Sequence, residues 1–107
     1  MKGSKALSLA GLSARAGKVS SGEFAVDKSI KTGKSYLVIA AEDASDNTRK
    51  KFMNSCSFYD VPFRVFSDKD TLGHAIGRQE RAVISIEDEG LANAVMTALE
   101  KENREGQ

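Results

Sequence analysis

The sequence contains very few of the residues that build disulfides and zinc sites. Its 107 residues include one cysteine, Cys56, and one histidine, His74. A single cysteine cannot form an internal disulfide, so nothing in the sequence requires an oxidising compartment. One cysteine and one histidine are also too few for a zinc site of the usual kind, and we expect no bound metal. We expect Cys56 to be a packed thiol on a helix and His74 to lie at or near the surface.

Long apolar segments and long runs of one charge are also missing. No segment approaches the length of a membrane span, so we expect no contact with a membrane. Ser8, Gly11 and Ser13 interrupt the apolar start of the chain, which ends at Arg15; this pattern argues against a signal peptide and favours the cytoplasm. Charged residues make up 29% of the chain and apolar residues 40%, a balance typical of a folded domain rather than a disordered chain.

The length fits one domain. A chain of 107 residues is too short for two independent cores, and no linker, repeat or low-complexity segment divides it. We therefore predict a single domain over residues 1–107, with a frayed tail at residues 101–107, and we expect a monomer.

Apolar residues recur at helical spacing in five segments, which cover about residues 7–16, 23–32, 46–59, 67–76 and 89–99. Glycines at positions 17, 33 and 77 follow three of these helices, where a left-handed cap is common. Ser20 and Glu23 have the spacing of a capping box at the start of the second helix. The third helix opens at Ser45 or Asp46, and the fourth at Ser67. The third is predicted to direct four side chains inward: Phe52, Met53, Cys56 and Tyr59.

Three short apolar runs predict buried strands at residues 36–41, 61–66 and 82–86, and residues 18–20 could form a very short fourth. Pro62 must lie at the start of its strand, where no ladder donor is needed. Helices alternate with these strands along the whole chain. This order predicts an α/β fold, a three-layer α/β/α sandwich with a small mixed sheet.

Evidence for an enzyme is thin. Acidic residues follow two predicted strands, at 42–43 and 87–89, and the ends of strands are where sites gather in α/β folds. A magnesium or hydrolase site there is one hypothesis, and ordinary charge at the start of a helix is the simpler one. A glycine-rich phosphate loop is absent. We expect no catalysis and no cofactor.

Charge is distributed unevenly along the chain. Residues 1–35 hold seven Lys/Arg against two acidic residues, whereas residues 61–107 hold six against nine. A basic segment indicates a polyanionic partner, although ordinary solvation of helix faces explains the count equally well.

Two places could bind RNA along one edge of such a sandwich. At the start of the second helix, Gly22 leaves the backbone approachable by phosphate, with Lys18, Lys28 and Lys31 nearby. The loop of residues 77–82 offers two guanidiniums, and arginine suits phosphate and guanine edges. Paired aromatics of the kind that stack single-stranded bases are missing, so a structured RNA fits better than a bare strand.

Several motifs resemble a known family. They are AGKVSSGE, LVIAAEDAS, YDVPFRVFSDKDTLGHAIG, and the closing AVISI with EDEG. Together they are similar to the ribosomal proteins named seven-A and thirty of archaea and eukaryotes, and more closely to the small bacterial YlxQ-like branch, over about residues 4–95. The resemblance implies the α/β/α fold and binding of kink-turns, sharply bent RNA helices with sheared G·A pairs. It places the RNA at the start of the second helix, the turn after residues 36–41, and the loop before the last strand.

Position by position, the resemblance implies that Gly22 opens the RNA-binding helix and that Lys28 and Lys69 contact RNA. Ala82 and Val83 match the apolar pair that packs on a flipped-out nucleotide. This chain departs from the family's pattern in two places. Phe24-Ala25 replaces the Asn-Glu that reads the G·A pairs, and losing base-edge contacts while phosphate contacts remain weakens specificity more than affinity. Glu80 stands in the loop where many relatives have a basic residue. The full predicted RNA-binding set is Lys18, Gly22, Glu23, Lys28, Lys31, Lys69, Arg78, Gln79, Arg81, Ala82 and Val83.

The main alternative is a protein-interaction module that keeps the fold but has lost the RNA site. Phe24 discriminates between the two. We expect it to pack in the core. A buried Phe24 with Lys28, Arg78 and Arg81 converging would favour structured, ribosome-associated RNA as the partner, whereas an exposed Phe24 would favour a protein.

Overall fold

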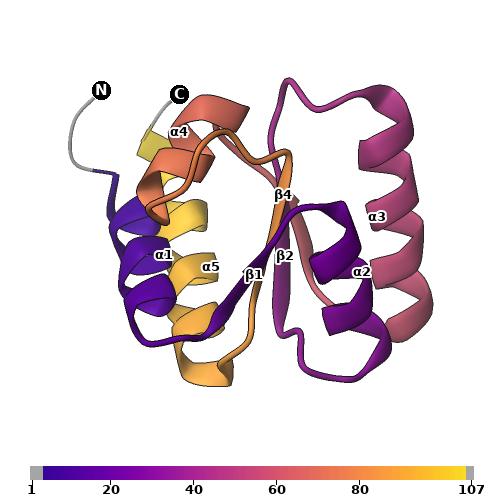
Figure 1. Cartoon of the computed structure of the whole chain (residues 1–107). Coiled ribbons are helices and arrows are strands. Elements are labelled where there is room, and N and C mark those ends of the chain that lie inside the picture. Colours follow the sequence, from indigo (N-terminus) through magenta and orange to yellow (C-terminus); the bar gives the residue numbers. More distant parts are fainter. Residues whose placement is uncertain (1–3, 106–107) are drawn as a thin grey trace.

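A central sheet with helices on each face forms three layers (Figure 1). The computed structural model describes residues 4–105, with side chains as far as residue 102. One face carries the helices α1 (Lys5–Arg15), α4 (Lys69–Ala75) and α5 (Glu89–Glu105), and the other carries α2 (Glu23–Lys31) and α3 (Asp46–Tyr59). The predicted α/β/α sandwich is confirmed.

The sheet is mixed, as predicted. Its strands are β1 (Val19–Ser21), β2 (Leu37–Ala40), β3 (Phe63–Val65) and β4 (Val83–Ile86), in the spatial order β1-β4-β2-β3. The strand β4 is antiparallel to both of its neighbours, β1 and β2, whereas β2 and β3 are parallel. All three of β1, β2 and β3 therefore finish at the end of the sheet where β4 begins. We call this the loop end.

Alternate residues of the central strands enter two separate cores, because successive side chains of a strand point to opposite faces. Ile39 and Ile84, which are register partners, belong to the core under α1, α4 and α5. Val38 and Val83 belong to the core under α2 and α3, together with Phe52 and three further residues. Both central strands are fully buried, which explains why they read as continuous apolar runs.

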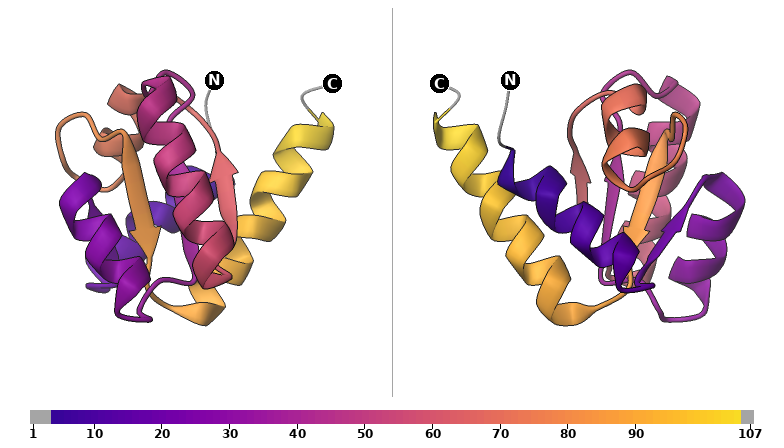
Figure 2. Two further views of the ribbon diagram at one scale, coloured as in Figure 1. Left: turned by 90° about the vertical axis from the view of Figure 1, so that its right-hand side faces the viewer. Right: turned by 60° about the vertical axis from the view of Figure 1, so that its left-hand side comes forward.

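The two outer helices α1 and α5 lie side by side on their face of the sheet (Figure 2). Near the chain ends, Ser4 Oγ donates to Glu102 Oε1 at 2.9 Å, and the Ala6 N–H donates to Glu102 Oε2 at 2.9 Å. Glu102 thus satisfies backbone and side-chain donors at the start of α1, while Ser4 also caps that helix by accepting from the Leu7 N–H. Residues 101–105, expected to fray, are helical here; residues 106–107 of that tail lie outside the described residues.

Three local predictions about α3 and α4 need correction. Phe52 and Cys56 are buried as predicted, but Met53 and Tyr59 are 49% and 42% exposed, because α3 packs on the sheet through a narrower stripe. The helix α4 begins one residue later than predicted. Asp68, not Ser67, is its N-cap: its carboxylate accepts from the Thr71 N–H at 2.7 Å, and this bond holds the pKa of Asp68 below its usual value.

Burial controls the chemistry of the only cysteine. Cys56 is 1% exposed within the core under α2 and α3, and desolvation raises the pKa of its thiol to about 11. The packed thiol predicted from the sequence is confirmed, and His74 is exposed, as expected. Within residues 4–105, no helix is both long enough and apolar enough to cross a membrane.

Replacing Phe52 with Ala should lower the free energy of unfolding by about 3–5 kcal/mol, because it leaves a cavity in a fully buried cluster. Phe58→Ala is the matched control. Phe58 is 81% exposed and its aromatic partner is Tyr59, edge-on in the same helix, so its loss should cost at most about 1.5 kcal/mol. Urea unfolding of both variants measures the difference, and equal losses would contradict the placement of Phe52.

The Cys56 thiol should resist alkylation in the folded protein. A pKa of about 11 instead of 9.0 leaves about a hundredfold less of the reactive thiolate near neutral pH, and burial hinders access further. We therefore expect a thiol reagent at pH 8 to react at least about a hundredfold faster with the urea-unfolded chain. Because the sequence has one cysteine, the label count reports this site alone. Equal rates would show that the native thiol is accessible.

Candidate nucleic-acid interface

Hydrogen bonds between backbone groups hold four connections together at the loop end. The Gly22 N–H at the start of α2 donates to the Val83 carbonyl at 3.0 Å, and the Ala41 N–H after β2 donates to the Ala82 carbonyl at 2.8 Å. The peptide groups that open β4 therefore fix the start of α2 on one side and the turn after β2 on the other. The three regions that the resemblance assigned to RNA do meet at this end (Figure 1).

The fourth connection, between β3 and α4, is tied to the same assembly. The Glu42 N–H donates to the Ser67 carbonyl at 2.7 Å, and the Lys69 N–H donates to Asp43 Oδ1 at 2.9 Å. The Lys69 carbonyl in turn accepts from the Arg81 N–H at 3.0 Å. Lys69 thereby sits between the turn after β2 and the loop before β4, and its side chain is half-buried.

The loop of residues 76–82, which joins α4 to β4, is pressed against α4. The Arg78 N–H donates to the Gly73 carbonyl at 2.9 Å, and Gly77 has a φ of +76°, a conformation that glycine adopts without strain. A Cβ on Gly73 would lie 1.8 Å from the Gln79 carbonyl oxygen, so only glycine allows the loop to approach this closely. The loop's path therefore depends on a residue outside it, which the sequence analysis did not single out.

Arg81 braces this loop against β1. Its Nε donates to Ser21 Oγ at 3.0 Å, and its Nη1 donates to the Glu80 carbonyl at 2.9 Å. Since these bonds occupy much of the guanidinium, Arg81 acts first as a positioning residue for the loop. Arg78 and Gln79 differ: both are exposed, and no hydrogen bond from either side chain to another described residue is present.

A groove runs between α1, β1 and the 76–82 loop, and we call it the arginine groove. Both guanidiniums of the loop line it, and no acidic side chain among the described residues does so. Its remaining lining is small or apolar: Ala14, Val19, Ser20, Ser21, Ala25, Ile76 and Gly77. The combination of two cations, two hydroxyls and no acid can hold an anionic group such as a phosphate.

The start of α2 is built differently from the prediction. Gly22 is its N-cap, with a φ of +90° and no side chain to cap the helix, so the predicted capping box is wrong. Ser20 instead donates from Oγ to Glu87 Oε2 at 2.7 Å, across to the end of β4. Glu23 does not reach back to the backbone. It accepts from Thr48 Oγ1 at 2.9 Å and lies 3.9 Å from Lys51 Nζ, both on α3.

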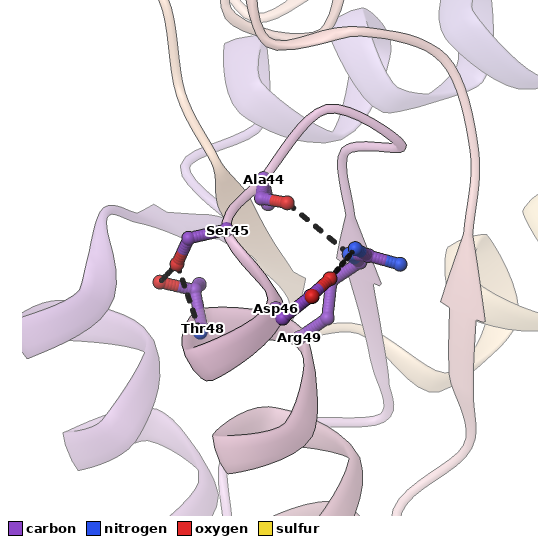
Figure 3. A network of polar contacts seen from close by, with 5 residues as sticks. All are labelled: Ala44, Ser45, Asp46, Thr48 and Arg49. Carbon is purple, nitrogen blue, oxygen red and sulfur yellow. Dashed lines mark hydrogen bonds and ion pairs between the residues drawn. The ribbon is translucent and has the colours of Figure 1, made fainter.

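The start of α3, by contrast, is fully capped (Figure 3). Ser45 Oγ accepts from the Thr48 N–H at 3.1 Å and donates to Thr48 Oγ1 at 3.0 Å. The Arg49 guanidinium is engaged by the Ala44 carbonyl and the Asp46 carboxylate. This helix start therefore offers neither a free capping position nor an uncommitted arginine.

The structure does not bring all the predicted cations together. Lys18 precedes β1 and lies at the opposite end of the sheet, where its carbonyl accepts from the Glu87 N–H. Lys31 is in the last turn of α2, away from the loop end, and pairs with Asp27 at 3.1 Å. Lys28 is exposed between these extremes. Of the three cations expected to converge, Arg78 and Arg81 line the same groove, whereas Lys28 lies on the exposed side of α2 and does not line it.

Two apolar predictions change as well. Val83 is fully buried in the core under α2 and α3, so only Ala82 of the predicted pair has any exposed surface. Phe24, expected in the core, is 85% exposed. Helical spacing could have shown this, because Phe24 lies almost opposite Val26 and Ile30, the residues that α2 buries.

The acidic strand ends do not form one site. Because β4 is antiparallel to β2, residues 42–43 lie at the loop end and residues 87–89 lie at the other. Asp43 is engaged by the Lys69 N–H, and Asp88 caps α5 by accepting from the Leu91 N–H. The described residues contain no group of three or more side chains suited to hold a metal ion.

Comparison with known proteins identifies the family. Residues 4–96 match the ribosomal protein L7Ae/L30e/S12e/Gadd45 family. The chain belongs to this family. Its relatives include the RNA-binding protein YlxQ of Bacillus subtilis (strain 168), 40% identical over 100 residues, which are 94% of this chain and all of the relative. The large ribosomal subunit protein eL8 of Thermoplasma acidophilum is 37% identical over 102 residues, covering 91% of this chain and 84% of the relative.

Two solved structures have the same fold over most of the chain. A protein of unknown function from Bacillus halodurans C superposes with a TM-score of 0.89 at 38% identity, covering 92% of this chain and 99% of that one. The 15.5kD RNA binding protein of Giardia lamblia superposes with a TM-score of 0.75 at 28% identity, covering 89% of this chain and 82% of that one. The family predicted from the sequence motifs is confirmed.

Replacing Arg81 with Ala should loosen the 76–82 loop, because it removes the bonds to Ser21 and the loop carbonyls. We expect a loss of about 1–2 kcal/mol in unfolding free energy and faster amide hydrogen exchange at residues 78–82. Arg78→Ala makes the same change of charge without removing such bonds and serves as the control. Equal exchange in the two variants would mean that Arg81 does not brace the loop.

Proposed function

We propose that this chain binds structured RNA of ribosomal origin, as a monomer and without catalysing a reaction. Its membership of the L7Ae family supports this, and so do relatives named as an RNA-binding protein and as a ribosomal protein. The observation that carries the proposal is the arrangement at the loop end, where the arginine groove lies beside the uncapped start of α2. The proposal includes a cytoplasmic location, where ribosomal RNA is found.

The geometry suits the RNA backbone better than the base edges. Arg78 presents an uncommitted guanidinium, and Arg81 adds a second, partly engaged one in the same groove. One guanidinium can donate to two phosphate oxygens at once, and backbone N–H groups at a helix start add further donors. Such contacts position the protein on an RNA without reading its sequence.

Recognition of kink-turns is the finer part of the proposal. The resemblance implies it, but Phe24 and Ala25 cannot make the hydrogen bonds by which an Asn-Glu pair reads G·A base pairs. The remaining phosphate contacts, in the arginine groove and at the start of α2, are those that the resemblance implies for a bent RNA. We therefore expect a preference for bent RNA that is weaker than a full set of base contacts would give.

A protein partner is the second candidate, and one observation favours it. Phe24 is exposed, which by our sequence-based criterion indicates a protein surface. Exposed aromatic side chains are frequent anchors of protein interfaces. Against this, the cations of the groove and the absence of acidic side chains from its described lining suit a polyanion.

The test is a titration of the protein with a kink-turn RNA and a straight duplex of matched length at two salt concentrations. We expect tighter binding to the kink-turn that persists at higher salt. Arg78→Ala and Lys28→Ala should each weaken binding and reduce the slope of log K against log salt by about one, since each removes a phosphate contact.

Lys101→Ala is the matched control, because Lys101 is exposed on α5 and belongs neither to the lining of the arginine groove nor to α2. It should leave both affinity and slope unchanged. Equal slopes in Arg78→Ala and the native protein would remove Arg78 from the site. Absence of binding to either RNA would give first place to the protein partner.

A further inference from the structure

Phe24 is the most exposed large apolar side chain among the described residues. It is the second residue of α2 and therefore lies in the helical turn that faces the loop end. Single exposed apolar residues are common on protein surfaces, so exposure by itself indicates nothing. The surroundings of the ring are what matter.

The residues next to Phe24 on α2 connect it to charged and polar groups. The next residue, Ala25, lines the arginine groove with Arg78 and Arg81. The preceding residue, Glu23, is turned to α3, where Thr48 and Lys51 engage its carboxylate. Lys28 stands one turn further along the same exposed face of α2 as Phe24.

The other exposed large apolar residues neither line the arginine groove nor belong to α2; they are Leu12, Tyr36, Met53, Phe58, Tyr59 and Val65. The centre of a protein interface is normally a cluster of apolar residues. A single exposed aromatic ring, next in sequence to a residue of the guanidinium groove and one helical turn from a lysine, instead matches a nucleotide, whose base has an apolar face and whose phosphates are anionic.

We propose that Phe24 is a stacking platform for one unpaired nucleobase of the bound RNA. This inference rests on the proposed function and specifies the class of RNA that is bound. With phosphates in the arginine groove and beside Lys28, the base of the nucleotide between them lies flat on the ring. Stacking detects that a base is unpaired but not which base it is, because every base has a stacking face.

The class of RNA that the protein prefers follows from this contact. The ring makes no hydrogen bonds, so it cannot select base pairs by their edges. Stacking strengthens binding to an RNA in which a bulge or internal loop presents an unpaired base next to a helix. A fully paired helix offers the same phosphates but no such base, so it uses the groove and leaves the ring unoccupied.

The test compares Phe24→Ala with the native protein on two RNA hairpins, one with a three-nucleotide bulge and one fully paired. Phe24→Ala should weaken binding to the bulged hairpin by about five-fold to a hundred-fold, the range for one base stacked on an aromatic ring. It should leave the paired hairpin and the salt slope unchanged, since no charge is lost. Phe58→Ala, at an 81% exposed aromatic residue on α3, should alter neither.

A spectroscopic measurement reports the stack directly. The sequence has no tryptophan, so Phe24→Trp introduces a single tryptophan at the proposed contact, which is excited at longer wavelength than the two tyrosines. Adding the bulged hairpin should quench its fluorescence, and replacing the bulged nucleotides by abasic sites should abolish the quenching. Phe58→Trp serves as the control and should show no response to either RNA.

The failures of the two proposals are distinguishable. If the native protein binds the bulged hairpin and Arg78→Ala weakens that binding while Phe24→Ala does not, the stacking role is wrong and RNA binding stands. If Phe24→Ala weakens both hairpins equally, the ring does not detect an unpaired base. If the native protein binds neither hairpin, both proposals are wrong, and Phe24 is better explained as an anchor for a protein.

Discussion

The position of β4 between β1 and β2 is the constraint on which the candidate interface depends. Its backbone must pair on both sides, and its four residues are completely buried. The same pairing extends to the start of the strand and the residue before it, where the Val83 carbonyl accepts from the Gly22 N–H and the Ala82 carbonyl accepts from the Ala41 N–H. The loop end is therefore assembled by the hydrogen-bond ladder of the sheet. A change of register in β4 would displace the start of α2 and the turn after β2 together.

Side chains then set how rigidly the 76–82 loop lies on this frame. Gly73 lets the loop touch α4, and Arg81 fastens it to Ser21 at the end of β1. A pre-positioned loop binds without first losing conformational freedom, so less of the binding energy is consumed in ordering it. Arg78 and Gln79, which carry no such bonds from their side chains to described residues, are the part of the loop left to meet a ligand.

Local sequence patterns were sufficient for the architecture and insufficient for the details of the site. The alternation of helices with fully apolar strands predicts the sandwich because it reflects burial on both faces of β2 and β4. The misplaced capping box has a long-range cause: Ser20 bonds to Glu87, 67 residues away, in preference to the nearby helix start. Lys18 was misplaced because β1 separates it from Gly22, so the two residues lie at opposite ends of the sheet although they are four positions apart in the sequence. Phe24 was assigned to the core from its apolar character, although the period of the helix puts it opposite Val26.

The distribution of charge at the loop end also differs from the distribution of charge along the sequence. The N-terminal third is the basic part of the chain, yet Lys18 lies at the other end of the sheet and Lys31 is paired with Asp27. The groove's two arginines come from the acidic part, residues 61–107. Because salt screens charges beyond about 10 Å, a phosphate responds to the groups around it and not to the net charge of the segment that supplies them. The acidic residues of that segment also include some committed elsewhere, such as Asp88 at the start of α5. A chain with a net charge of +1 can thus carry a local cationic groove, and folding, not composition, creates it.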